Sequence, residues 1–290
     1  MDKSPVKTEG LILQISDIID IAVIAVLAVG GAAAGVYFSR RKYWAVYFCI
    51  SFLLYLTILI INRTPSFYYQ LPFSWFFKGR GEYLFFSLSL PVMFGTLIPR
   101  LKASRQRLMV WGLAAVGTGY FGAIPVVQTL LVRERLNGLE TWREDGVCLQ
   151  TTDFTCGPAS AVTALEKLGI EAEESALALA AYTTPSWGTS SGQLAQAIET
   201  LYGRQGVRCR IMRFDSIEQL RGICPVIATV EYRFMVDHYV TVLDVEEDTV
   251  LVGDPLKGQE RLSFEAFEEK WRRVGILVNR EQIEKAVPLQ

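Results

Sequence analysis

Four long apolar runs dominate the first half of the chain and limit what that half can fold into. They cover residues 21–38, 43–61, 83–99 and 108–132, and charged residues lie only at their borders. A helix that crosses a bilayer core needs about 20 predominantly apolar residues. Buried helices of a soluble protein are the alternative, but four such runs in succession favour membrane spans. We therefore predict four transmembrane helices.

Local features of these runs predict where the helices bend and whether the first is retained. Pro91 lies inside the third run, where it can kink a helix, and the fourth run should tilt or bend near 117–125. The first run could instead be a cleaved signal peptide. Its flank, however, carries Glu9, Asp17 and Asp20 rather than the basic residues typical of such signals. A retained span is therefore favoured.

The two halves of the chain carry opposite charge. Residues 1–136 hold 14 Lys and Arg against 6 Asp and Glu, whereas residues 137–290 hold 15 against 24. We therefore expect a transmembrane anchor domain over 1–136, in contact with the lipid bilayer, and a soluble domain over 137–290. The acidic balance of the second domain argues against nucleic acid as a partner.

The distribution of Lys and Arg between the spans predicts their orientation. Basic residues are densest at 40–42 and 100–107, and the connection 62–81 is poorer in them and rich in aromatic residues typical of a membrane interface. The first and third connections should therefore be cytoplasmic, which places both termini and the soluble domain outside. Four further basic residues, Lys3, Lys7, Arg133 and Arg135, lie on the outer side, so the total numbers of basic residues on the two sides are nearly equal. The prediction therefore rests on how closely the basic residues cluster at 40–42 and 100–107.

The second half has the pattern of a compact α+β domain, in which helices precede a mostly antiparallel sheet. Helices are expected over 155–168, 173–182, 192–202 and 263–271, and strands over 207–214, 225–232, 238–245, 249–254 and 275–278. A turn at 246–248 should join two of these strands into a hairpin.

Five cysteines form no CxxC pair, and the sequence contains a single histidine. A structural zinc site built from Cys and His therefore has little support, and neither a metal nor a cofactor is predicted. The odd number of cysteines also means that at least one thiol is free.

Cys156 is the first candidate for chemistry, because it opens a predicted helix. Pro158 suits an early helical position, and Gly157 leaves space beside the sulfur. The positive end of the helix dipole and the free N–H groups there favour the thiolate, which is the reactive form. A small buried cysteine that merely packs at the start of a core helix is the alternative.

His238 and Asp254 are the second candidate group. His238 begins one strand of the predicted hairpin, and Asp254 ends the other. Residues near opposite positions on one face of a hairpin are about 5–8 Å apart, so a carboxylate could orient the imidazole. Asp237 and Asp244 are competing carboxylates, and a surface histidine without a catalytic role is the alternative.

Gln150, six residues before Cys156, completes the pattern. Its side-chain amide could donate to an oxyanion beside the Cys156 backbone N–H, although most glutamines are simply solvated. Gln-x5-Cys-Gly-Pro, then His-Tyr-Val-x-Val, then Gly-Asp-Pro resembles the bacteriocin-processing, double-glycine leader peptidase family over roughly 145–280. Members of that family are papain-like domains, often fused to the front of ABC exporters.

The resemblance implies an α+β papain-like cysteine peptidase domain behind the four spans. It implies a nucleophile at Cys156, a base at His238, an orienting carboxylate at Asp254 and an oxyanion donor at Gln150. It further implies an endopeptidase that cleaves peptide or protein substrates, often after a Gly-Gly pair of a leader, at a bacterial-type plasma membrane. Because no P-loop follows the domain in this sequence, a separate exporter is a candidate partner. Thr155 departs from the acidic residue that commonly precedes the nucleophile.

Three other functions are open on the sequence. The second domain could bind peptides without cutting them, although loss of Cys or His would be expected in that case. It could be another thiol acyl-transfer enzyme of transglutaminase type, which also uses Cys, His and Asp. The four spans could form a transporter or channel, but their few intramembrane polar groups favour an anchor.

Overall fold

The computed structural model describes residues 4–63, 81–233 and 236–281, with side chains described from residue 18 onward except at 62 and 63. The aromatic stretch predicted to lie at a membrane interface, 66–77, falls outside the described residues. The chain divides into two compact units, Met1–Leu131 and Val132–Gln290. Each unit is described below by itself.

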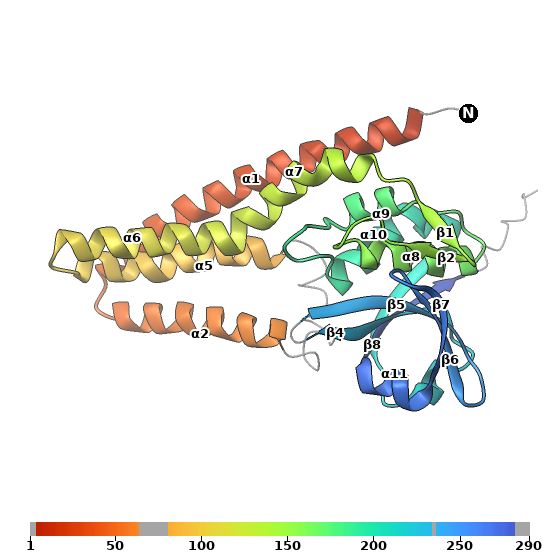
Figure 1. Cartoon of the computed structure of the whole chain (residues 1–290). Coiled ribbons are helices and arrows are strands. Elements are labelled where there is room, and N and C mark those ends of the chain that lie inside the picture. Colours follow the sequence, from red (N-terminus) through yellow and green to blue (C-terminus); the bar gives the residue numbers. More distant parts are fainter. Residues whose placement is uncertain (1–3, 64–80, 234–235, 282–290) are drawn as a thin grey trace, which may run out of the picture. The chain divides into compact units, whose positions relative to one another are not determined.

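Long helices form the first unit (Figure 1). They are α1 (Ser4–Ser39), α2 (Trp44–Arg63), α5 (Gly81–Leu97) with a short 3-10 turn at Ile98–Arg100, α6 (Ser104–Thr118) and the start of α7 (Ile124–Asn137). Among the described residues, four stretches are long and apolar enough to cross a membrane: Ile18–Ser39, Trp44–Ile61, Gly81–Arg100 and Ser104–Asn137. These agree with the four predicted spans, although α1 begins well before the first apolar run.

The predicted bend in the fourth span takes the form of a π-helical segment, Gly119–Ala123, between α6 and α7. Pro125 has no N–H, so the carbonyl four residues before it receives no helical hydrogen bond from it. The ladder shifts by one residue just before this proline, and the Ile124 N–H donates to the Gly119 carbonyl five residues back. The helix therefore continues past Pro125 instead of ending there.

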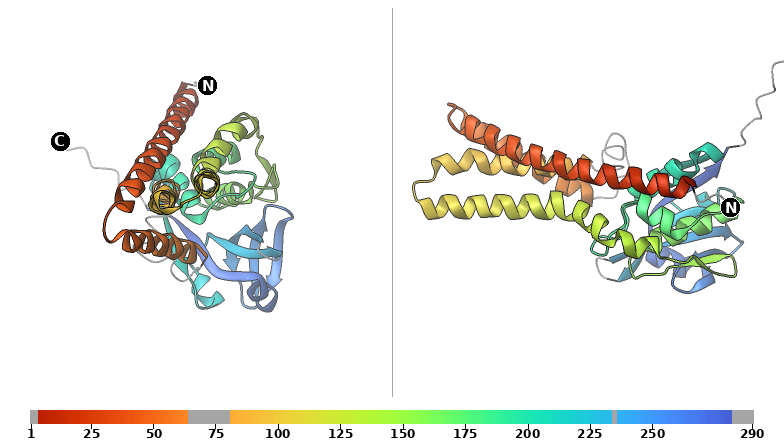
Figure 2. Two further views of the ribbon diagram at one scale, coloured as in Figure 1. Left: turned by 90° about the vertical axis from the view of Figure 1, so that its left-hand side faces the viewer. Right: turned by 90° about the horizontal axis from the view of Figure 1, so that it is seen from above.

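Helices α1 and α5 approach closely because glycines face each other. Figure 2 shows the helices of this unit from two further directions. A Cβ added at Gly31 would lie 2.6 Å from the Leu88 carbonyl oxygen, and one at Gly95 would lie 2.9 Å from the Ala32 carbonyl oxygen. Small residues that let backbones touch are the usual basis of helix association in membranes.

Neighbouring glycines of α1 supply a matched test of this contact. Gly31→Val should lower the melting temperature of the detergent-solubilised protein, because the new methyl groups collide with the backbone of α5. Overpacking of this kind typically costs about 1–3 kcal/mol. Gly30→Val is the control, since a Cβ at Gly30 meets nothing within 4 Å. Equal melting temperatures for both variants would show that α1 and α5 do not depend on this contact.

The second unit consists of helices packed on a curved antiparallel sheet (Figure 1). Its helices are α8 (Cys156–Lys167), α9 (Glu174–Ala180), α10 (Ser191–Tyr202) and α11 (Phe264–Lys270). The six-stranded sheet has the order β3 (Val207–Arg213), β8 (Trp271–Arg280), β4 (Val226–Arg233), β5 (Val236–Val245), β6 (Thr249–Asp254), β7 (Gly258–Ser263). A separate hairpin pairs β1 (Trp142–Glu144) with β2 (Val147–Leu149).

This architecture confirms the predicted fold class, four apolar helices followed by an α+β domain. Helices α8 and α10 cover one face of the sheet through a core that includes Val162, Leu194 and Ile227. Helix α11 covers the other through Phe267, which packs against Trp271 of β8. The hairpin β1–β2 and strand β7 were not predicted. Strand β7 reads GQERLS, and its polar edge position leaves little hydrophobic alternation to detect.

A β-bulge in β5 sets which side chains share a face of the sheet. Strand β5 pairs with β6 through Val245↔Val250, but the register shifts between Val242 and Asp244, so Leu243 is the extra residue. Val242 then pairs with Val252, and the pairing continues through Thr241↔Gly253. In a strand without the bulge, every β5 residue before Leu243 would point to the opposite face.

Candidate active site

Cys156 is the first residue of α8, as predicted, and this helix is fixed directly to β5. The Ser160 hydroxyl donates to the Tyr239 carbonyl at 3.0 Å, and the Thr241 hydroxyl donates to the Ser160 carbonyl at 2.7 Å. Ser160 and Thr241 are completely buried, so water does not compete for these bonds. The first turn of α8 is therefore held beside the strand that carries His238.

His238 and Asp254 form a buried hydrogen bond. The imidazole Nε2 lies 2.8 Å from the Asp254 Oδ1, and the two residues are 6% and 7% exposed. The two residues are diagonal neighbours across β5 and β6, because the bulge places both on the face that carries Val242 and Val252. The Leu256 N–H also donates to Asp254 Oδ1 at 2.9 Å and holds the carboxylate in place.

The Cys156 side chain lies close enough to the His238 imidazole to act on its pKa. Since Nε2 is occupied by Asp254, Nδ1 is the nitrogen left for the thiol. Burial by itself lowers the pKa of His238, but hydrogen bonds and charges from Asp254 and Cys156 outweigh it and raise the pKa to about 9. His238 therefore holds its proton at neutral pH and places a positive charge beside the sulfur.

Asp254 is ionised in this arrangement. Burial raises the pKa of its carboxyl, but the bond to His238, the Leu256 N–H and the charge of His238 more than offset that effect and lower it. The two competing carboxylates do not take its place. Asp237 pairs with Arg272 at 2.9 Å on the surface, and the exposed Asp244 accepts from the Val245 N–H.

Gln150 lies on the loop between β2 and α8, next to Asp254 in space. Its backbone N–H donates to the Pro255 carbonyl at 2.9 Å, and its side-chain Nε2 donates to the Thr152 carbonyl at 2.6 Å. A side-chain amide carries two N–H groups, so one remains available for another acceptor. The Oε1 of Gln150 is buried and has no partner among the described residues.

A buried glutamate, which the sequence did not single out, supports this loop. Glu174 of α9 is completely buried and accepts from the Thr151 N–H at 3.0 Å and from the Thr151 hydroxyl. Thr155, at the position where an acidic residue was expected, holds the same loop instead: its hydroxyl oxygen accepts from the Thr152 N–H at 3.2 Å. The loop between Gln150 and Cys156 is therefore fixed by side-chain hydrogen bonds.

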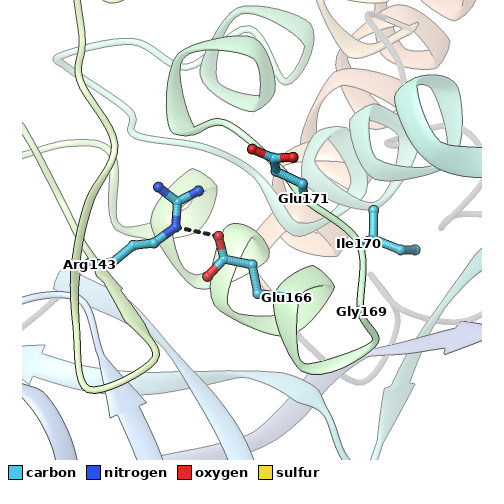
Figure 3. A pocket seen from close by; sticks show the side chains of 5 residues that line it. All are labelled: Arg143, Glu166, Gly169, Ile170 and Glu171. Atoms are coloured by element: carbon cyan, nitrogen blue, oxygen red, sulfur yellow. Dashed lines mark hydrogen bonds and ion pairs between the residues drawn. The ribbon is translucent and has the colours of Figure 1, made fainter.

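The remaining described part of the chain offers no second arrangement of this kind. No cluster of three or more His, Cys, Asp and Glu within the described ranges is suited to a metal ion. Figure 3 shows a surface hollow lined by Arg143, Glu166 and Glu171, in which Arg143 pairs with Glu166. Glu166 lies ten residues along α8 from Cys156, a rise of about 15 Å, so this hollow is separate from the Cys–His–Asp group.

Residues 145–283 match the model of the Peptidase C39 family. An uncharacterised protein of Methanothermobacter marburgensis is 29% identical over 139 residues, which are 48% of this chain and 92% of that protein. The probable functional amyloid protease FapD of Pseudomonas aeruginosa is 27% identical over 164 residues, 55% of this chain and 71% of FapD.

Solved structures of similar domains were also found. A double glycine motif protease from an AMS/PCAT transporter, in complex with its leader peptide, has 18% identity and a TM-score of 0.41, covering 47% of this chain and 91% of that one. The peptidase domain of Streptococcus ComA has 22% identity and a TM-score of 0.41, covering 46% and 96%. The family match confirms the predicted resemblance and, with it, the enzyme class: a cysteine peptidase.

Selective alkylation should identify the reactive thiol. Cys156 lies at the start of α8 beside the protonated His238, and a positive group beside a cysteine favours its reactive form. Burial raises the pKa of Cys148 to about 12 and that of Cys224 to about 11. Iodoacetamide followed by peptide mass spectrometry should therefore find Cys156 modified first.

His238→Ala should abolish this selectivity, because no imidazolium then remains beside the sulfur. Cys224→Ser is the control and should leave the labelling of Cys156 unchanged. If Cys148 or Cys209 were modified before Cys156 in the native protein, the assignment of the nucleophile would be wrong.

Proposed function

We propose that this chain is a membrane-anchored endopeptidase whose catalytic residues are Cys156, His238, Asp254 and Gln150. The observation that carries the proposal is the buried His238–Asp254 hydrogen bond, with Cys156 beside the same imidazole. A degenerate module that only binds peptides would not need an imidazole held between a carboxylate and a thiol. The Peptidase C39 match favours peptide hydrolysis over acyl transfer of the transglutaminase type.

The residues would act in a fixed order. The Cys156 thiolate attacks the carbonyl carbon of the scissile bond, and the resulting oxyanion accepts from the Cys156 backbone N–H and from Gln150 Nε2. The protonated His238 then gives its Nδ1 proton to the leaving amine, the C–N bond breaks, and a thioester remains. His238, now neutral, removes a proton from water, whose oxygen attacks the thioester and releases the acid and the thiolate.

The four apolar stretches support the proposed anchor, and the peptidase class supports a peptide or protein substrate. We propose cleavage after small residues, as the resemblance to leader peptidases implies. The space expected beside Gly157 is filled instead, because a Cβ there would lie 3.2 Å from Thr189 and 3.4 Å from Leu194. A separate exporter as partner stays a prediction from the sequence.

Substitution of the four residues should produce two classes of variant, measured on a peptide library that contains Gly-Gly sequences. Cys156→Ala and His238→Ala should abolish turnover, because they remove the nucleophile and the proton carrier. Gln150→Ala should lower kcat by about 10²–10³ with little change in KM, since the donor acts on charge that develops in the transition state. Asp254→Asn should retain a measurable rate, because the thiolate–imidazolium pair can form before substrate binds.

Matched substitutions elsewhere in the sheet serve as controls. Gln259→Ala removes an exposed glutamine of β7, and Asp237→Asn removes a surface carboxylate next to His238, so both should keep the wild-type rate. Full activity in Gln150→Ala would remove the oxyanion role. Full activity in Asp254→Asn would mean that another group orients the imidazole. Cleavage confined to bonds after bulky residues would contradict the proposed substrate class.

The density of basic residues at 40–42 and 100–107 supports a peptidase domain outside the cytoplasm. A recognition sequence for a site-specific protease, inserted in the exposed turn 246–248, should be cut when that protease is added to intact spheroplasts. The same sequence inserted at 101–103, in the connection expected to be cytoplasmic, should be cut only after lysis. The reverse pattern would invert the proposed topology.

A further inference from the structure

Exposed apolar side chains gather beside the His238–Asp254 pair. In the described part of the second unit, the large hydrophobic residues that are exposed are Trp142, Trp187, Tyr232, Val236 and Leu256. Single exposed apolar residues need no explanation. Three of these, however, lie next to His238 or Asp254, either in space or along the chain. We call Tyr232, Val236 and Leu256 the apolar platform.

Tyr232 contacts the imidazole directly. Its ring centroid lies 5.8 Å from that of His238, yet 59% of the residue is exposed. The β4–β5 pairing explains both facts: Val230 pairs with His238, and the register then shifts between Glu231 and Arg233, so that Tyr232 is the extra residue. A bulge of this kind redirects a side chain. One side of the phenol ring therefore covers His238 and the rest is free to contact a ligand.

Leu256 and Val236 are exposed apolar residues next to the same catalytic pair. The Leu256 backbone donates to the Asp254 oxygen that also accepts from His238, and its side chain is 46% exposed. Val236 lies two residues before His238 on β5 and is 37% exposed. Neither apolar side chain belongs to a buried core cluster of the described residues. The platform thus combines a ring that contacts His238, a residue whose N–H bonds Asp254, and a residue two positions before His238.

The chemistry of the proposed reaction identifies which part of the substrate meets this surface. The acyl side of the substrate becomes bonded to Cys156, whereas the leaving amine receives its proton from His238. The residue that carries this amine must therefore lie against the imidazole and what surrounds it. Resting on the proposed function, we propose that the apolar platform selects a bulky apolar side chain immediately after the scissile bond. The preferred substrate then has a small residue before the cut and an aromatic or large aliphatic residue after it.

Two peptides that are identical except for Phe or Ser after the scissile bond test this specificity. Wild-type enzyme in detergent should cleave the Phe peptide with a kcat/KM about tenfold or more above that of the Ser peptide, as is usual for apolar contacts. Tyr232→Ala should bring this ratio close to one, mainly by slowing cleavage of the Phe peptide. Leu256→Ala should reduce the ratio in part. Trp142→Ala is the matched control, because Trp142 is exposed but lies on the β1–β2 hairpin.

Several outcomes would overturn the inference. Cleavage of both wild-type peptides at one rate would do so directly. If Tyr232→Ala slowed both peptides equally and also slowed alkylation of Cys156, Tyr232 would support His238 rather than the substrate. If Tyr232→Ala changed the rate of cleavage only in lipid vesicles, and not in detergent, the platform would contact the bilayer rather than the substrate.

Failure of the proposed function is distinguishable from failure of this inference. If wild-type enzyme cut neither peptide, binding would still be measured with the Cys156→Ala variant. That variant should bind the Phe peptide more tightly than the Ser peptide, and the difference should vanish on adding Tyr232→Ala. Equal affinity of Cys156→Ala for both peptides would overturn the platform independently of catalysis.

Discussion

The buried hydrogen bond between His238 and Asp254 is the interaction on which the rest of the peptidase domain depends. Two ionised groups that are less than a tenth exposed pay a large desolvation cost, which only good geometry and further hydrogen bonds offset. The domain supplies both. The Leu256 N–H donates a further hydrogen bond to the carboxylate, and the Cys156 side chain lies beside the imidazole. The bulge at Leu243 brings His238 and Asp254 to one face of the sheet.

Hydrogen bonds from helices α8 and α9 and from the loop before α8 position the remaining part of the site, Gln150 and Cys156. Glu174 and Thr155 fix the loop that carries Gln150, and Ser160 and Thr241 fix the helix that carries Cys156. These hydrogen bonds exist before any substrate arrives, so the groups around the sulfur need little rearrangement when charge develops on oxygen. A buried carboxylate in α9 thus contributes to the site without touching the sulfur.

The sequence predicted the parts of this protein that depend on local patterns. Uninterrupted apolar runs predicted four spans, and Cys156 at a helix start with His238 and Asp254 on one hairpin predicted the residues that the structure brings together. The bulge at Leu243 was not predictable, because consecutive apolar residues in VTVLDV fit either face of a strand. Nor was the role of Glu174, since a glutamate in the first turn of a helix is normally explained by solvent and the helix dipole.

The bulge at Leu243 also bears on how such a domain can change over evolutionary time. Residues of β5 can be substituted one at a time, because a substitution does not change which face of the sheet the neighbouring side chains point to. Removal or addition of a single residue between His238 and Leu243 would turn the imidazole away from Asp254, however well the new side chains packed. This part of β5 can therefore change by substitution, but the insertion or deletion of one residue would separate the imidazole from its carboxylate.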